Sequence, residues 1–435
     1  MPFQNPVIVI PGITATELID DYPMTSDTVW SMVLNKEYER VALHPDDLTF
    51  EAIEPAHVFP GRAFSIYDDL IRMLRHELSQ AADKPTPVFA FPYDWRVDVQ
   101  ATAARLVAFI EEVLKRTALL RYYADAGDGL RVDLVGHSMG GLIISECLLQ
   151  LGGKAAGKVS KVATIGTPFL GSLEAIVKVA TGMSLLTGST PHEREREAAR
   201  VTPAVYQLFP SYANAAVEAT GGGATVDVDL LNPENMQASI LASLAEFVRL
   251  YSVKPKDRRT RAQEILEELI AGARAHRERV RKLKPKVDWL AVVGVGQKTR
   301  VQMTVTRLRG KPRFEISDSQ FVNDLTRDTP ASRRTGDGTV PLEGALPPFM
   351  SDTQPICVIE QDLGFLELRD RMLVQFGGFH GLLPAVNLVQ RLVVRHFFPK
   401  YRGPVWGRPV PGTDPTQWAP PIPGLERRDY SALPG

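Results

Sequence analysis

The stretch that decides the fold is "RVDLVGHSMGGLII", residues 131–144. A short apolar run leads into Gly-His-Ser-Met-Gly-Gly, and an apolar helical pattern follows. A single serine, Ser138, lies between Gly136 and Gly140, so the sequence predicts a sharp strand-to-helix turn that exposes one hydroxyl. Glycine at these two positions keeps side chains away from neighbouring backbone. The alternative interpretation is a glycine-packed corner without chemistry.

Strands and helices are expected to alternate around this turn. Apolar runs predict further buried strands at Val7–Ile10, Pro87–Trp95, Lys161–Pro168 and Val287–Thr299. Apolar residues at helical spacing predict helices at Val99–Leu119 and Leu142–Leu151. This alternation is typical of a parallel sheet with helices on both faces, which also explains why the strands are continuously apolar.

The alternation stops after Ser172, and the chain after it reads as mostly helical up to a new strand. The predicted organisation is an α/β core formed by residues 1–172 and 287–402, a largely helical cap at 173–286 and a Pro-rich, extended tail at 403–435. A glycine-rich link is expected within the cap, at Gly221–Gly223.

Composition excludes several classes of protein. The chain has 435 residues and a net charge of -1, so no overall basic character points to nucleic acid. Its two cysteines are too few for a disulfide framework, and no Cys/His spacing suggests a metal site; neither a metal nor a cofactor is expected. The N-terminus lacks a signal-peptide pattern, and no apolar run approaches the roughly 18 residues that span a bilayer. We therefore expect a cytoplasmic protein.

One helix of the predicted cap is strongly basic. Residues 254–286 contain twelve Lys or Arg against five Asp or Glu. Apolar residues at helical spacing form a stripe along it: Ala262, Ile265, Leu266, Leu269, Ile270 and Ala273. Its basic C-terminal end is interpreted either as a solvated face that suits the helix dipole or as peripheral contact with an anionic lipid surface.

A serine nucleophile needs a base, and the base needs a carboxylate to orient it. Asp337 lies between two glycines in "TGDGTVP", a loop that can direct an acid into a crowded site, although an ordinary Asp-Gly turn is the alternative. His380 lies in "FGGFHGLLP", on a loop that leads into an apolar helix. We prefer it to His276, which lies in the basic helix, and to His396, which lies late in an apolar helix.

Two backbone amides are expected to stabilise an oxyanion beside Ser138. The amide of Met139 lies at a helix N-terminus, where the dipole favours negative charge. The amide of Ile13 follows Gly12 in the loop after the first core strand. His137 is expected to be a packing residue that points away from Ser138.

These segments together resemble the lecithin:cholesterol acyltransferase-like family of the α/β-hydrolase superfamily, which includes lysosomal phospholipase A2 and phospholipid:diacylglycerol acyltransferases. The matching blocks are "PVIVIPGI", "PYDWR" (Pro92–Arg96), "GHSMGG", "IGTPFLGS" (Ile165–Ser172), "YQLFPS" (Tyr206–Ser211) and "GDGTVP". The resemblance implies an α/β-hydrolase fold and a triad of Ser138, Asp337 and His380. It also implies Ile13 and Met139 at the oxyanion positions.

The resemblance further implies a glycerolipid ester as substrate, with acyl transfer through an acyl-enzyme to water or to an alcohol. The Asp94–Arg96 block then lies near the site or serves as scaffolding. Apolar cap stretches at Val177–Leu186 and Ile240–Leu250 line an acyl-chain site or simply pack helices together. The alternative functions are a general carboxylesterase or triacylglycerol lipase, and a catalytically silent binding module. The complete Ser-Asp-His order argues against the silent module.

Overall fold

The structure is a computed structural model that describes residues 4–22, 24–32, 36–53, 55–183, 192–220, 224–253, 257–317, 320–325, 334–363 and 378–430. Its centre is a six-stranded sheet in the order β17-β12-β9-β8-β1-β7, and every pair of neighbouring strands is parallel. The strands are β1 (Val7–Ile10), β7 (Val88–Ala90), β8 (Val132–His137), β9 (Val159–Ile165), β12 (Asp288–Gly294) and β17 (Ile356–Val358). The predicted parallel α/β sheet is confirmed, although β7 is much shorter than the expected run.

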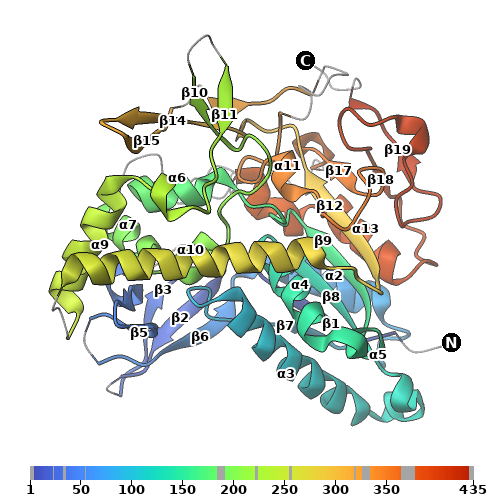
Figure 1. Ribbon diagram of the computed structural model, residues 1–435. Coiled ribbons are helices and arrows are strands. Elements are labelled where there is room, and N and C mark those ends of the chain that lie inside the picture. The colour runs from blue at the N-terminus through green and yellow to red at the C-terminus, as the bar shows by residue number, and fades with distance from the viewer. Residues whose placement is uncertain are drawn as a thin grey trace.

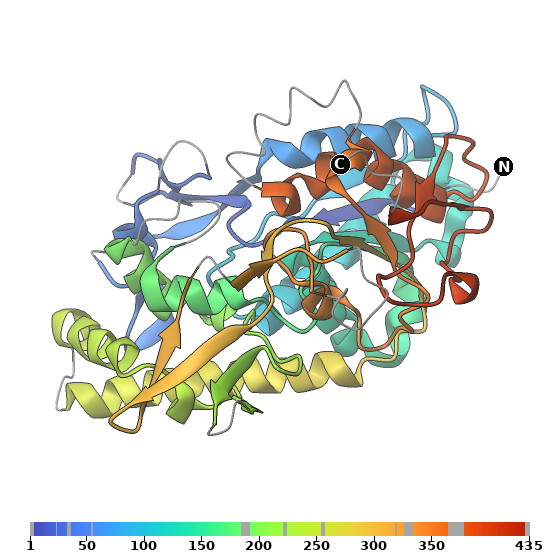
Figure 2. The same ribbon diagram turned by 90° about the horizontal axis from the view of Figure 1, so that it is seen from above.

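Helices cover both faces of this sheet, which Figures 1 and 2 show from two directions. Helices α3 (Val99–Ala118) and α4 (Met139–Leu151) pack together on one face, and α2 (Asp68–Leu78) and α13 (Asn387–Phe397) pack together on the other. Alternate residues of β1 enter the two apolar cores: Ile8 and Ile10 one, Val7 and Val9 the other. Because both faces are covered, the strands are apolar at successive positions.

The chain between β9 and β12 forms most of a cap beside the sheet (Figure 1). Its helices are α6 (Leu173–Thr181), α7 (Glu193–Arg200), α8 (Pro203–Tyr206), α9 (Ala238–Tyr251) and α10 (Arg258–Lys282). It also contains a four-stranded sheet formed by β11 (Thr225–Asp227), β10 (Ala216–Ala219), β14 (Met303–Leu308) and β15 (Lys311–Glu315). Strands β14 and β15 follow residue 286, so the cap sheet joins segments from both sides of the predicted boundary. The expected link at Gly221–Gly223 lies outside the described residues.

A small antiparallel sheet near the N-terminus has no counterpart in the sequence-based prediction. It consists of β3 (Asp27–Trp30), β2 (Thr16–Asp20) and β6 (Val58–Ala63). The shorter elements are α1 (Tyr38–Val41), β4 (Leu43–His44), β5 (Asp47–Glu51), α5 (Ala155–Lys158), β13 (Thr299–Arg300), β16 (Phe321–Val322), α11 (Leu342–Ala345), β18 (Trp406–Gly407) and β19 (Glu426–Arg427). Among the described helices, none combines the length and apolar character needed to cross a membrane.

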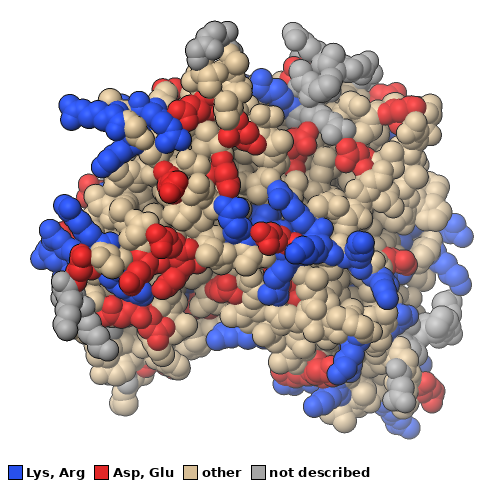
Figure 3. All heavy atoms as spheres, in the orientation of Figure 1, with Lys and Arg blue, Asp and Glu red and all other residues tan. Residues whose placement is uncertain are grey.

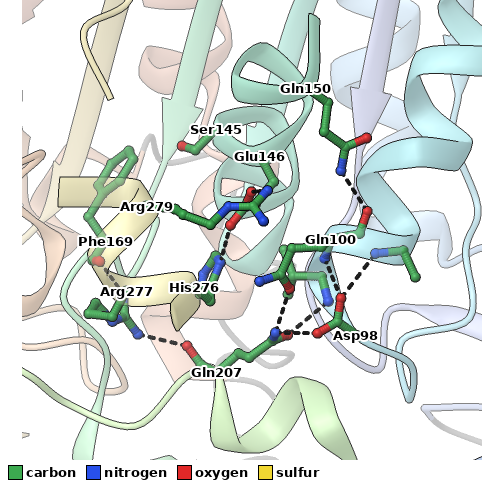
Figure 4. Close-up of polar contacts among 12 residues, drawn as sticks. Asp98, Gln100, Ser145, Glu146, Gln150, Phe169, Gln207, His276, Arg277 and Arg279 are labelled. Carbon is green, nitrogen blue, oxygen red and sulfur yellow. Dashed lines mark hydrogen bonds and ion pairs between the residues drawn. The ribbon is translucent and has the colours of Figure 1, made fainter. Parts of the chain in front are cut away.

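Helix α10 joins the cap to the core through buried polar contacts (Figure 4). The predicted apolar stripe is confirmed, since all six of its residues are buried. Arg277, which is 2% exposed, donates to the carbonyl oxygens of Gln207 (2.7 Å) and Phe209 (3.2 Å), and also to that of Phe169. One of the cations expected on the basic end of α10 is therefore inside the protein.

A second contact links α10 to α4. Glu146 of α4 is fully buried, and its carboxylate binds the Nδ1 atom of His276 at 2.7 Å and the guanidinium of Arg279. Burial, as the largest cause, lowers the pKa of His276. Along the exposed face of α10, acidic side chains lie between two basic ends (Figure 3). The exposed face of this helix thus carries charges of both signs, while its last turn keeps the basic residues that the sequence predicted, Arg279, Arg281 and Lys282.

The chain after residue 403 follows the β17 edge of the sheet. Cys357 of β17 and Arg408 exchange two backbone hydrogen bonds, of 2.9 and 3.1 Å. The carboxylate of Asp362 accepts from the Arg408 guanidinium at 2.7 Å and from the Trp406 indole at 2.9 Å. These contacts fix the tail to the core.

Arg277→Met should lower the free energy of unfolding by about 3 kcal/mol, because it leaves several buried carbonyl groups without a donor. Chemical denaturation measures this loss. Arg259→Met, at an exposed position near the start of the same helix, is the matched control and should change stability by less than about 0.5 kcal/mol. Equal effects of the two substitutions would contradict the assignment.

Asp133→Asn should stabilise the protein at high pH. Burial raises the pKa of Asp133 to about 7, whereas an unfolded chain ionises it near ~4. Between these values the folded state holds a proton that the unfolded state has lost, so wild-type stability falls as the pH rises. The substituted amide would keep an oxygen that can accept from the Lys161 backbone amide, as the carboxylate does at 3.0 Å. The advantage of the variant should grow by about 1 kcal/mol per pH unit in this window; Asp288→Asn, at an exposed position, is the control.

Candidate active site

Ser138 lies at the turn between β8 and α4, with φ 51° and ψ -126°. A non-glycine residue with positive φ is strained, and such strain is typical of functional sites. The close approach of two backbone segments explains the flanking glycines. A Cβ atom on Gly136 would lie 2.7 Å from the Gly141 nitrogen, and one on Gly140 would lie 2.3 Å from the Ile10 oxygen. The expected sharp turn is therefore present.

The structure brings Ser138, His380 and Asp337 together, although they are far apart in the sequence. The Nε2 atom of His380 lies 2.9 Å from Ser138 Oγ, and its Nδ1 atom lies 2.6 Å from Asp337 Oδ2. All three side chains are largely buried; Ser138 is 7% and His380 8% exposed. Because a carboxylate accepts from Nδ1–H, Nε2 is left to accept the serine proton. A hydroxyl, an imidazole and a carboxylate are thus linked in series by two hydrogen bonds.

The loop around Asp337 folds so that one carboxylate oxygen holds the loop and the other meets the histidine. Oδ1 accepts the backbone amides of Thr339 (3.0 Å) and Val340 (2.7 Å), which leaves Oδ2 for His380. The Thr299 hydroxyl accepts the amide of Gly338 at 2.9 Å, which ties the loop to β13. The Asp-Gly turn that was the alternative interpretation is thus present, and it also presents Asp337 to His380.

The two rival candidates for the base, His276 and His396, lie elsewhere, whereas His137 lies beside the site. His276 binds Glu146, as described above, and His396 is buried in α13, where burial lowers its pKa to about 4. His137 is buried directly before Ser138, and its two ring nitrogens bind the Tyr67 hydroxyl and the His380 carbonyl oxygen. Its ring is thus tied to neighbouring groups and is not bonded to Ser138 Oγ.

The loop after β1 lies against Ser138. A Cβ atom on Gly12 would lie 3.0 Å from Ser138 Cβ, so only glycine fits there without displacing neighbours. Tyr93 donates its hydroxyl to the Pro11 carbonyl oxygen at 2.9 Å and holds this loop from the other side. Ile13 follows directly, and Met139 is the first residue of α4. Met139 thus follows Ser138 directly and Ile13 follows the glycine that approaches it, while their role as oxyanion donors stays a prediction.

The Asp94–Arg96 block forms a buried ion-pair cluster. Arg96 is 1% exposed and binds both carboxylate oxygens of Asp94, at 2.9 and 2.7 Å, and Glu51 at 2.8 Å. The backbone oxygen of Arg96 accepts from Ala204 of the cap. These contacts connect the N-terminal segment, the core and the cap.

The fold and these residues define an α/β-hydrolase with a serine at the strand-to-helix turn after its central strand. The family model of lecithin:cholesterol acyltransferase matches residues 51–345. The chain therefore belongs to the lecithin:cholesterol acyltransferase family, whose members are lipid ester hydrolases and acyltransferases. A search of curated protein sequences finds no match.

A comparison with solved structures finds matches at low sequence identity. The structure of the Tle4–Tli4 complex matches with a TM-score of 0.55 and 15% identity, over 79% of this chain and 89% of that chain. The mature lipase BlEst2 of Bacillus licheniformis matches at 13% identity over 91% of this chain and 93% of that chain, with a TM-score of 0.38. Phospholipase PlaB of Legionella pneumophila matches at 10% identity over 73% and 68%, with a TM-score of 0.25. The Tle4–Tli4 structure, with its TM-score above 0.5, is similar in fold alone at this identity.

Sequence reasoning missed two residues that contact this site. Tyr67 precedes α2 in a segment without a recognisable motif, and Thr299 is the first residue of β13. Tyr67 is far in sequence from Gly12 and His137, and Thr299 is 39 residues from Gly338. A sequence signal for Thr299 was its place at the end of a predicted strand, at the edge of the sheet where such sites form.

Gly140→Ala should destabilise the protein by about 2 kcal/mol, because the new methyl group would collide with backbone of β1 rather than with a flexible side chain. The collision would also displace Ser138, so labelling of Ser138 by a fluorophosphonate should slow. Gly153→Ala is the control, since a Cβ atom there meets nothing within 4 Å. Unchanged stability and labelling in Gly140→Ala would show that the turn is less crowded than described.

Proposed function

We propose that this protein hydrolyses or transfers the acyl group of a lipid ester, with Ser138 as nucleophile, His380 as general base and Asp337 as its orienting carboxylate. The observation that carries this proposal is the pair of hydrogen bonds that His380 makes, at 2.9 Å to Ser138 and 2.6 Å to Asp337. Family membership supports the lipid ester as the class of substrate.

In the first half of the reaction, Ser138 Oγ attacks the ester carbonyl carbon while His380 Nε2 takes the hydroxyl proton. Asp337 keeps the proton of His380 on Nδ1 and stabilises the imidazolium that forms. The amides of Ile13 and Met139 donate to the oxyanion, and the N-terminal dipole of α4 adds to this stabilisation. Collapse of the tetrahedral intermediate expels the alcohol, which takes the proton from His380.

In the second half, water or another alcohol attacks the acyl-enzyme and gives its proton to His380. Collapse of the second intermediate breaks the bond to Ser138 Oγ, which takes the proton back from His380, and releases a fatty acid or a new ester. The same residues serve both acceptors, so the chemistry of the triad is common to hydrolysis and acyl transfer. Incubation with mixed phospholipid vesicles and an added long-chain alcohol would separate them, because free fatty acid reports hydrolysis and a new ester reports transfer.

The cap is proposed to accommodate the acyl chain. Buried apolar side chains of α6 and α9 include Ile176, Val177, Ile240 and Leu244, which lie in or beside the two stretches that the sequence suggested. The end of the first stretch, up to Leu186, lies outside the described residues. Packing between cap helices remains the other role of these side chains.

Ser138→Ala should abolish turnover of a p-nitrophenyl acyl ester and labelling by a fluorophosphonate, with the fold retained. Ser145→Ala is a matched control on the helix that follows, because its hydroxyl is also buried but binds the Gly141 carbonyl oxygen at 2.9 Å. Full turnover by Ser138→Ala would eliminate the proposed nucleophile. Absence of labelling in the wild-type protein would instead favour the silent binding module.

Asp337→Asn should lower kcat by about 10³–10⁴, because the amide of asparagine favours the wrong tautomer of His380. Stopped assays with the same ester measure the change, and KM should move little. A loss of less than tenfold would mean that another group orients the histidine.

A further inference from the structure

Two buried side chains that the proposed mechanism does not use connect opposite sides of the site. Tyr67, at the end of the 3-10 turn Ser65–Tyr67, places its hydroxyl 2.9 Å from the Gly12 nitrogen and 2.8 Å from His137 Nδ1. The Nε2 atom of His137 lies 3.0 Å from the carbonyl oxygen of His380. Tyr67 and His137 are only 1% and 5% exposed. We call this pair the Tyr67–His137 bridge.

The chemistry of the partners fixes the direction of every hydrogen bond in the bridge. The His380 carbonyl can only accept, so His137 must donate from Nε2–H. In a neutral imidazole Nδ1 is then an acceptor, and the Tyr67 hydroxyl must donate to it. The Tyr67 oxygen is left to accept the amide proton of Gly12. Every donor in this sequence has an acceptor, so one arrangement of protons satisfies all of them.

The ring of His137 stays neutral under the conditions in which an esterase operates. Burial, together with the nearby His380, lowers its pKa to about 3. The two rings lie only 5.1 Å apart. Because His137 is neutral, it places no second positive charge beside His380. The bridge therefore keeps its proton arrangement while His380 gains and loses a proton.

We propose that the Tyr67–His137 bridge positions the base relative to the oxyanion loop, with His137 and Tyr67 as positioning residues for the reaction proposed above, on which this inference rests. His380 is held at both of its backbone groups: its amide donates to the Asp337 carbonyl oxygen at 3.1 Å, and its carbonyl accepts from His137. At the other end, the bridge fixes Gly12, whose successor Ile13 is the proposed oxyanion donor.

This placement has a kinetic consequence. Without the bridge the His380 backbone loses one of its two hydrogen bonds, and the imidazole can move away from Ser138 Oγ. Small displacements of a base strongly slow proton transfer. Because neither bridge side chain bonds to Ser138 Oγ, the loss should fall on kcat and on the rate of acylation, with KM nearly unchanged.

The test compares Tyr67→Phe, His137→Gln and His137→Leu in p-nitrophenyl ester turnover and in the second-order rate of fluorophosphonate labelling. The glutamine amide can still donate to the His380 carbonyl, whereas leucine cannot. We expect kcat and labelling to fall at least tenfold in Tyr67→Phe and about a hundredfold in His137→Leu, with KM within about twofold. His137→Gln should recover much of the activity that His137→Leu loses, an ordering that a purely structural role would not produce.

Tyr123→Phe is the matched control, because it removes the hydroxyl of another buried tyrosine. The Tyr123 hydroxyl donates to the Gln4 carbonyl oxygen at 2.8 Å. Gln4 precedes β1, whereas Gly12 follows it, so this contact lies at the other end of the strand. It should label like the wild type. If His137→Leu does not fold, Tyr67→Phe alone decides the matter. Wild-type rates in Tyr67→Phe, or equal rates in the glutamine and leucine variants, would overturn the inference. A wild-type protein that is not labelled would remove the proposed function, and the inference with it.

Discussion

The backbone of Ser138 is the constraint on which the rest of the site depends. Its positive φ costs of order 1–3 kcal/mol, and the turn persists because β8 and α4 are both firmly packed. The turn places the hydroxyl at the carboxyl ends of the parallel strands, where the loops after β1 and β9 also begin. Asp337 and His380 reach the same edge from much later in the chain. If Ser138 adopted an unstrained backbone conformation, its hydroxyl would no longer lie beside His380.

The features that could be predicted from the sequence are those that a short segment encodes by itself. The glycine spacing around Ser138, the alternation of strands with helices and the apolar stripe of α10 are all properties of short segments, and the structure confirms them. Asp337 and His380 were found because the order of such residues along the chain is a property of the fold. Their proximity to Ser138 matches that expectation, while their catalytic roles stay a prediction.

The features that were missed depend on contacts distant in sequence. The Tyr67 hydroxyl meets Gly12 and His137, which are 55 and 70 positions away. Strand β10 pairs with β14 across the whole of α9 and α10. Arg277 belongs to the basic end of α10, for which the sequence predicted a solvated or lipid-facing surface, and its four carbonyl acceptors stabilise it inside the protein.

The C-terminal tail, residues 403–435, also affects whether the β17 edge of the sheet can pair with another molecule. A strand at the edge of a sheet presents unpaired amides and carbonyls that attract strands from other molecules. In this protein, Arg408 takes up those of Cys357 on β17, and its guanidinium holds Asp362 so that the cover stays in place. Because Arg408 occupies the amide and carbonyl of Cys357, these two groups are not free to pair with a strand of another molecule.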